Sequence, residues 1–378
     1  MKKTVMCLAA ASAVALASAL VAAPASAHDH GGSPPTAGPP DDITTGLVSP
    51  LSLEVDRQRV SYITQNFAGL LTRVARDGTT SVLASAEGEE ISAVSSRDGY
   101  VYYAQIAMDH TSGSMVRIPE GGGTPEPFAD LYAHEAAENP DGEIVYGFTG
   151  LTPECAAQFP PPEPMIPPAE YTGTVDIHPY ASLALNNAIF VADAGANAIT
   201  RVDYDGTVST VAVLPAQPSV EVTAEFIAGS PLPECVIGSN FIPEAVPTDV
   251  EIGPDGWLYV TTLPGGPESG DFGGRASVYK VNQRSGEVQL VVSGLTGATG
   301  LAVASDGTIY VAELFGGPDG SGQISVIEKG ASAPVALTAV PLPAAIEIRS
   351  NRLFVTWNAL GPDGVPPAGT LSVIEVSR

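Results

Sequence analysis

Apolar and polar residues alternate in short stretches along most of this chain, and the same alternation recurs with a turn in its middle. The clearest copies, residues 248–262 and 299–313, read TDVEIGPDGWLYVTT and TGLAVASDGTIYVAE. A period of two places successive side chains on opposite faces of a β-strand. The Asp-Gly pairs supply the positive φ that tight hairpins need. The pattern therefore predicts β-hairpins. Four further copies occupy residues 52–64, 92–104, 182–193 and 344–357.

Most copies continue into a second hairpin, as in residues 70–84, 198–212 and 277–292, so each unit has about four strands. The shortest intervals between the starts of consecutive units are 40 and 45 residues. Propeller blades repeat at roughly this spacing. The sequence thus predicts an all-β fold, a six-bladed β-propeller with four-stranded antiparallel blades. A β-sandwich would explain the alternation but not six copies of one signature.

The ends of the chain predict how the ring closes. Residues 372–378 supply only a third strand for the last unit, and the chain then stops. Residues 44–55 read like the end of one blade leading into the next. We therefore expect residues 43–48 to form the outer strand of the C-terminal blade, so that N-terminal and C-terminal strands pair and leave no free sheet edge.

The first residues are typical of an export signal. The chain opens with MKK, continues with an apolar run to Ala23 and reaches ASA at residues 25–27. These features predict a signal peptide over residues 1–27 and a secreted mature protein without membrane insertion. Residues 28–42, rich in Gly, Pro, His and Asp, are interpreted as a disordered leader. Residues 43–378 are then a single propeller domain.

Two proline-rich insertions interrupt the repeats, at about residues 120–176 and 215–247. Each contains a Pro-Glu-Cys sequence, which ends at Cys155 in the first and at Cys235 in the second. An even number of cysteines in an exported chain favours a disulfide. The bond would tie the two insertions together across neighbouring blades.

The charge balance excludes some partners. The chain has 42 acidic and 16 basic residues, for a formal net charge of −26. Such a surface repels nucleic acid and anionic membranes and keeps the protein soluble. We expect no nucleic-acid partner, and we expect a monomer.

Several motifs resemble a known family. They are the GL-x-x-P and GL-x-x-A-T-G blade openings at residues 46–50 and 294–300, and the D-G-x-[IL]-Y-V-[AT] segments at 255–261 and 306–312. The sequence FVADAG, starting at Phe190, is similar to an NHL-type blade. Together they resemble the ScyD/ScyE family, exported bacterial propellers related to the NHL and gluconolactonase-like group. The resemblance covers residues 43–378 and implies the propeller architecture, but it implies no established activity.

Loops that follow each unit's second strand, and loops that lead into its first strand, should share one face of a propeller. This face is the expected ligand-binding surface. Its candidate residues are Gln65, Gln105, His178, Tyr180, Trp357 and Asn358.

Three carboxylates from different units, Asp193, Asp249 and Glu313, are a candidate metal site, because their oxygens suit a hard cation such as calcium. They can equally be solvated or paired with backbone amides. No other cofactor is indicated by these residues. If cleavage follows Ala27, His28 and His30 lie at a free amino terminus, whose amine, two amides and the His30 imidazole suit Cu(II) or Ni(II).

One further motif, residues 134–138 (HEAAE), lacks the second histidine of the zinc-protease pattern, and we interpret it as a short polar helix. The sequence thus favours a non-enzymatic propeller that binds an extracellular protein, glycan or small ligand. A divalent-metal-dependent lactonase-type hydrolase is the alternative. A quinone-dependent sugar dehydrogenase would need a basic cofactor cleft, which five histidines and few lysines do not favour.

Overall fold

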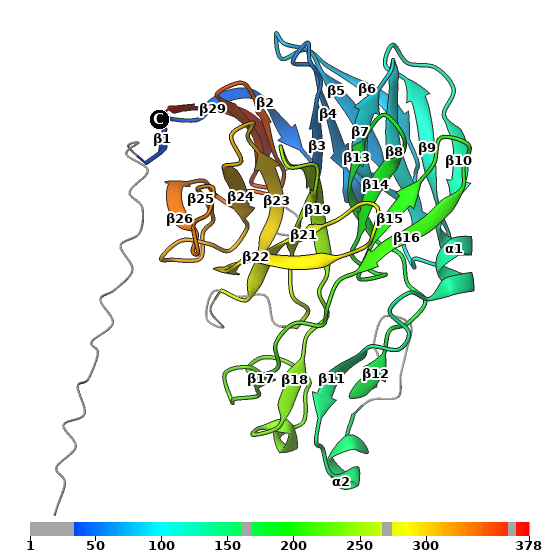
Figure 1. Cartoon of the computed structure of the whole chain (residues 1–378), viewed down its shortest axis with the longest axis vertical. Helices are drawn as coiled ribbons and strands as arrows, with labels where there is room; N and C mark the ends of the chain where they lie inside the picture. Colours follow the sequence, from blue (N-terminus) through cyan, green and yellow to red (C-terminus); the bar gives the residue numbers. More distant parts are fainter. Residues whose placement is uncertain (1–33, 160–167, 267–273, 362–367, 378) are drawn as a thin grey trace, which may run out of the picture. The chain divides into compact units, whose positions relative to one another are not determined.

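The computed structural model describes residues 34–159, 168–266, 274–361 and 368–377. Residues 35–378 form one compact unit, built almost entirely of antiparallel strands (Figure 1). Among the described residues, no helix is long and apolar enough to cross a membrane. The propeller architecture expected from the repeats is confirmed, because six sheets form blades and their innermost strands contact one another in a closed ring.

The first three blades follow chain order from the inner strand outward. The first comprises β3 (Ser52–Val55), β4 (Ser61–Gln65), β5 (Leu70–Val74) and β6 (Thr80–Ser85). The second comprises β7 (Glu89–Arg97), β8 (Tyr100–Ala107), β9 (Gly113–Pro119) and β10 (Glu126–Asp130). The third comprises β13 (Pro179–Ala184), β14 (Ile189–Asp193), β15 (Ala198–Val202) and β16 (Val208–Val213).

The remaining blades complete the ring. The fourth comprises β19 (Pro247–Ile252), β20 (Leu258–Thr262), β21 (Ala276–Val281) and β22 (Val288–Leu295). The fifth comprises β23 (Ala298–Val303), β24 (Ile309–Glu313), β25 (Gln323–Ile327) and β26 (Val335–Ala339). The sixth comprises β27 (Ile346–Arg349), β28 (Arg352–Trp357), β29 (Gly369–Ser377) and the N-terminal strands β1 (Thr36–Ala37) and β2 (Asp41–Leu47).

The hydrophobic core lies between blades, with one apolar cluster at each of the six interfaces that the described residues form. Strand β14 shows why the sequence produces this arrangement. Its Ile189 and Val191 pack toward the second blade, whereas Phe190 and Ala192 pack toward the fourth. Both faces of a middle strand are buried, so alternation directs each side chain into one of two cores.

The ring closes as the sequence predicts. Strand β2 pairs antiparallel with β29, and its Leu47 is buried in the core between the sixth and first blades. The leader is shorter than the sequence suggested, however. Thr36 and Ala37 pair with Ser377 and Val376. Part of the segment interpreted as disordered is therefore ordered, because the edge of β29 offers its backbone groups to it.

The two insertions form a sheet of their own, which we call the insertion sheet. Its strands lie in the order β12 (Glu170–Thr172), β11 (Val145–Thr149), β18 (Asn240–Ile242) and β17 (Val220–Glu221). The helices α1 (Leu131–Glu138) and α2 (Pro153–Ala156) and the 3-10 helix η2 (Glu234–Val236) belong to the same insertions, and η1 (Asn66–Ala68) follows β4. The first insertion begins later than predicted, since β10 still belongs to the second blade.

The predicted disulfide is confirmed. Cys155 and Cys235 are bonded, with Cα atoms 5.7 Å apart, and the bond joins the two insertions. Cys155 packs in a small apolar core with Phe148, Val222 and Phe226. A disulfide fits an oxidising compartment.

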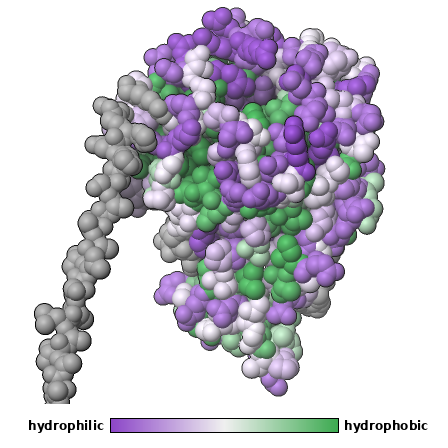
Figure 2. Space-filling view, viewed as in Figure 1, coloured by the Kyte–Doolittle hydropathy of each residue, from purple (hydrophilic) through white to green (hydrophobic). Residues whose placement is uncertain are grey.

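Hydrophilic residues gather on the upper part of the face in Figure 2, over the turns of the first two blades, while apolar residues appear nearer the insertion sheet. Large exposed apolar side chains occur singly in several elements, as at Phe67, Leu290 and Val335. Such scattered residues are normal on a soluble surface.

Candidate metal centre

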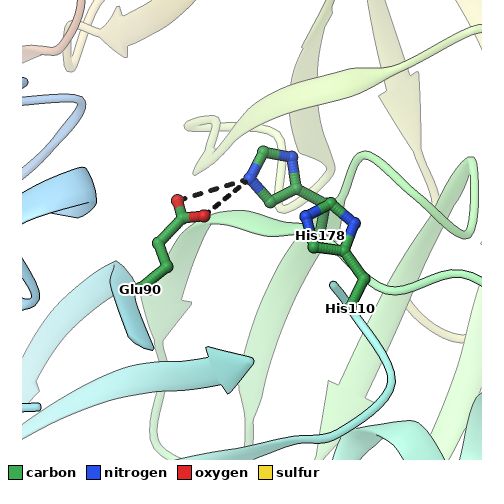
Figure 3. A group of neighbouring side chains, drawn as sticks. All are labelled: Glu90, His110 and His178. Atoms are coloured by element: carbon green, nitrogen blue, oxygen red, sulfur yellow. Dashed lines mark hydrogen bonds and ion pairs between the residues drawn. The ribbon is translucent and has the colours of Figure 1, made fainter. Parts of the chain in front are cut away.

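Glu90, His110 and His178 come from three separate parts of the chain and meet at one end of the second and third blades (Figure 3). Glu90 lies on β7, His110 in the turn from β8 to β9, and His178 directly before β13. One ligand atom from each lies within 4.8 Å of the others. Within the described part of the chain, no other group of three His, Cys, Asp or Glu side chains gathers so closely.

The turn after β8 fixes His110. Its backbone has φ of 58°, in the left-handed region, and its N–H donates to the Ala107 carbonyl over 2.9 Å. Its Nδ1 lies 2.9 Å from Oδ1 of Asp176. A carboxylate on one imidazole nitrogen orients the ring and leaves the other nitrogen for a ligand, as in many metal sites.

The backbone around His178 is held on both sides. Its N–H donates to Oδ1 of Asp193 over 2.7 Å, and its carbonyl accepts from Ala194 N–H over 2.9 Å. Gly195 is required here, because a Cβ at this position would lie 2.9 Å from the His178 nitrogen. The imidazole, 24% exposed, extends toward Glu90, so a ligand can reach it.

A hydrogen-bond chain from the first blade orients Glu90. Oγ1 of Thr64 donates to Oδ1 of Asn66 over 2.6 Å, and Nδ2 of Asn66 donates to Oε1 of Glu90 over 2.7 Å. Both oxygens of Glu90 lie 3.3 Å from Nε2 of His178. The site therefore links three blades through side chains.

Burial and charge oppose each other at this pair. Burial alone would lower the pKa of His178, but the hydrogen bond and charge of Glu90, with the charges of Asp193 and Asp176, raise it overall. Burial alone would raise the pKa of Glu90, but His178 and Asn66 lower it overall. Each of the two residues thus favours the charged form of the other.

The donors are two imidazoles and one carboxylate. The rings of His110 and His178 are nearly parallel, with an interplanar angle of 15° and centroids 4.8 Å apart. A metal ion lies close to the plane of each imidazole that binds it, so one ion requires one ring to turn out of this stack. Nitrogen and carboxylate donors in this combination suit Zn²⁺ and other first-row divalent ions.

The three carboxylates predicted as a metal site do not form such a group. Asp193 accepts hydrogen bonds from backbone N–H groups of His178 and Ala196. The other two do the same elsewhere: Asp249 accepts from Val250 and Leu301, and Glu313 accepts from Thr296. The interpretation as partners of backbone amides, which the sequence left open, is the arrangement that the structure shows.

A side chain that accepts a hydrogen bond from a loop N–H recurs in several blades. Gln65, Asp193 and Glu313 each end the second strand of a blade and accept a hydrogen bond from the N–H of the loop that leads into it. The inner strands have a register shift beside this loop in the third, fourth and fifth blades. Such irregularities leave backbone N–H groups unpaired, and Asp193 and Glu313 satisfy them in the third and fifth blades.

The other predicted ligand-face residues also make local contacts. Gln105 bonds to Glu89, and the Trp357 indole N–H donates to Oγ of Ser372 over 2.7 Å. The backbone of Asn358 has φ of 48° and turns the chain after β28. These contacts hold the loops in place.

Of that predicted group, His178 belongs to the candidate metal centre. Tyr180 is its neighbour, with its ring edge-on to the His178 imidazole at 6.2 Å. The sequence did not single out Glu90 or His110. His28 and His30 lie outside the described residues.

A cluster of acidic side chains lies in the central channel, the space that the six inner strands surround. A cavity of about 10 Å³ is lined by residues of all six inner strands, Asp249 and Glu251 among them. Arg349 contacts Glu347 at 2.8 Å and Glu54 at 3.5 Å. Arg349 thus pairs with two of the carboxylates, and its charge also acts on Glu251. We call Glu54, Asp249, Glu251, Glu347 and Arg349 the channel cluster.

Burial raises the pKa of the channel carboxyls. It raises the pKa of Glu54 to about 7, with a further contribution from Glu347, and it raises the pKa of Asp249 to about 7. The pKa of Glu251 lies well above its ordinary value because of burial and the charges of Glu347 and Asp249. The cluster therefore holds protons near neutral pH.

The fold and this site define a six-bladed β-propeller with a candidate metal centre at one end of its blades. No family model matches the chain. No curated protein matches it either.

Two solved structures with TM-scores above 0.5 show the same fold. The PQQ-bound aldose sugar dehydrogenase from Streptomyces coelicolor superimposes with a TM-score of 0.55 at 14% identity, covering 91% of this chain and 99% of that one. A protein from Thermus thermophilus described as a glucose dehydrogenase gives 0.52 at 13% identity, covering 89% and 99%. A gluconolactonase from Xanthomonas campestris gives 0.49 at 11% identity, covering 91% and 98%. At these identities the likeness shows the fold alone, because propellers host unrelated activities.

Proposed function

We propose that this chain is an exported, metal-binding propeller in which Glu90, His110 and His178 hold one divalent first-row transition-metal ion. The observation that carries the proposal is the convergence of three donor atoms within 4.8 Å. Asp176, which orients His110, and Asn66, which orients Glu90, support the same interpretation. Metal ligands in proteins typically have such outer partners.

Three protein donors leave coordination positions open. Structural zinc sites fill four positions with protein ligands, whereas sites with three keep a position for water or substrate. A small extracellular ligand with a carboxylate, lactone or hydroxyl oxygen suits such a position. Binding of such a ligand is the function that we favour. It is also compatible with the resemblance to ScyD/ScyE propellers, which implies no activity of its own.

Hydrolysis is the second candidate, and the composition of the donor set favours it. Two histidines and one glutamate hold the zinc of several hydrolases. A metal bound this way would lower the pKa of a bound water and polarise an ester carbonyl. Asp176 and Asn66 would hold the metal ligands His110 and Glu90 in position.

The first test is metal binding by the purified full chain. We expect one Zn²⁺, Mn²⁺ or Ni²⁺ per chain by elemental analysis after dialysis. Glu90→Gln and His178→Ala should each weaken the affinity more than about 100-fold, since the loss of outer partners alone costs about 10–100-fold. Glu89→Gln is the matched control, because Glu89 precedes Glu90 on the same strand and bonds to Gln105 instead. Equal affinity in all four proteins would contradict the proposal.

The loaded protein then separates the two candidates. Release of acid from a panel of lactones and esters by the native chain, lost in Glu90→Gln but kept in Glu89→Gln, would establish hydrolysis. A loaded protein that binds lactone or carboxylate ligands in calorimetry without turnover would be a binding protein.

A further inference from the structure

Among the described residues, four buried polar atoms without a hydrogen-bond partner lie in one short stretch of the first insertion. They are Oε1 of Glu135, Oδ1 of Asn139, Oδ1 of Asp141 and the hydroxyl of Tyr146. Glu135 and Asp141 are 2% and 1% exposed. Most buried polar groups in proteins are hydrogen-bonded, and an orphan group commonly marks an ion or a water.

Three of these residues contact the same segment of the chain, residues 173–176. Asn139 ends α1 in a left-handed conformation, and its Nδ2 donates to the Gly173 carbonyl over 3.1 Å. Asp141 packs directly on Gly173, where a Cβ would lie only 2.0 Å from its Oδ1. On the other side, the backbone N–H of Asp176 lies close to the Glu135 carboxyl, a contact that opposes only in part the rise in pKa caused by burial.

The other contacts of Asp141 leave one oxygen without a partner. Its Oδ2 accepts from Nδ2 of Asn197 over 2.9 Å. The Tyr146 hydroxyl lies beside the carboxylate without a hydrogen bond of acceptable geometry. Oδ1 of Asp141 therefore remains available to a ligand.

This stretch is also rich in carboxyl groups. No ion pair joins Glu135 or Asp141 to a basic side chain among the described residues. Burial, followed by the charges of Asp193, Asp141 and Asp176, raises the pKa of Glu135 to about 8. Buried carboxylates are costly without a partner of opposite charge. A bound cation would remove this cost.

We propose that Glu135, Asn139 and Asp141 bind a calcium ion beneath the segment from Gly173 to Asp176. The available donors are two carboxylates and one amide oxygen, with no imidazole or thiolate among them, and oxygen donors of this kind suit Ca²⁺. Backbone carbonyls and water complete a shell of six to eight oxygens. The site is separate from the Glu90–His110–His178 centre in residues and in donor type.

Calcium here would couple the first insertion to the metal centre. The ion would connect α1 to the segment between β12 and β13 (Figure 1). This segment contains Asp176, which orients His110, and it ends at His178. The ion would thereby hold two residues of the centre at their positions without touching them.

The test uses terbium as a calcium substitute, with excitation of tyrosine, and melting of the full chain with and without calcium. The Glu90→Gln background removes a ligand of the other centre. We expect one Tb³⁺ per chain, displaced by Ca²⁺. Calcium at about 100 times Kd should raise the melting temperature by about 4 °C.

Asp141→Asn and Glu135→Gln should abolish both effects, whereas Glu138→Gln, on the exposed side of the same helix, should keep them. If the buried variants do not fold, equilibrium dialysis of ⁴⁵Ca against the Glu90→Gln chain still tests the proposal, because the proposal requires one bound calcium ion per chain. Absence of bound calcium, or an equal calcium response in Asp141→Asn, would overturn the proposal.

Discussion

Deleting residues 34–47 is expected to lower the melting temperature by about 10 °C. Strand β2 carries Leu47 into the core between the sixth and first blades and covers the edge of β29. Losing a fully buried leucine costs about 1.5–3 kcal/mol, and each lost ladder hydrogen bond about 1 kcal/mol. A total of roughly 5 kcal/mol or more lowers the melting temperature by about 2 °C per kcal/mol in a large domain.

Differential scanning calorimetry checks this prediction, with a chain that begins at Pro34 as the control. Leu47→Ser tests the same contact without shortening the chain and should give a smaller decrease. An unchanged melting temperature in the deletion would mean that β2 does not close the ring.

Stability is expected to fall as the pH rises from about 4 to 7, because of the channel cluster. Glu54 and Asp249 have folded-state pKa values of about 7, above those of an unfolded chain. Their contribution to stability is complete below the unfolded pKa of about 4 and is lost as the pH rises through about 7. A pKa shift of two to three units corresponds to a change of roughly 3–4 kcal/mol in the free energy of unfolding per group. Coupling between the carboxyls makes their combined contribution smaller than the sum of the separate ones.

Glu251→Gln is the informative variant. Glu251 adds negative charge to the cluster, while Arg349 contacts Glu347 and Glu54 directly. We expect the variant to melt several degrees higher than the native chain at pH 8 and to show a shallower pH dependence. Arg349→Met removes the shared cation and should have the opposite effect at pH 8. Parallel pH curves for the native chain and Glu251→Gln, measured with a chelator present, would exclude the channel cluster as the cause.

The architecture could be predicted because it depends on local alternation. In β14, four consecutive apolar residues supply both neighbouring cores, and a period of two is visible in any single sequence. The pairing of β2 with β29 was also predictable, since the last unit showed only three strands and residues 44–55 resemble the end of a blade. The leader boundary was not, because the Thr36–Ala37 pairing depends on the free edge of β29.

The site could be predicted only in part. His178 was found because it precedes an inner strand. Glu90 reads as an ordinary polar residue at the start of β7, and His110 reaches the site only through a left-handed backbone conformation that the sequence does not reveal. Asp193 and Glu313 stand at the right ends of their strands, but local backbone N–H groups compete for their oxygens. Glu135 lies in a motif that looks polar, yet tertiary packing buries it.

The disulfide also changes how the protein would respond to mechanical tension. The bond between Cys155 and Cys235 spans 80 positions of the chain and encloses the whole third blade in a covalent loop. A pull on the two termini would extend the blades outside the loop while the third blade bears no load. The fully stretched chain would be shorter by roughly 260–290 Å, at about 3.3–3.6 Å per residue. The pairing of β1 and β2 with β29 joins the two ends of the described chain and would be the first contact to separate.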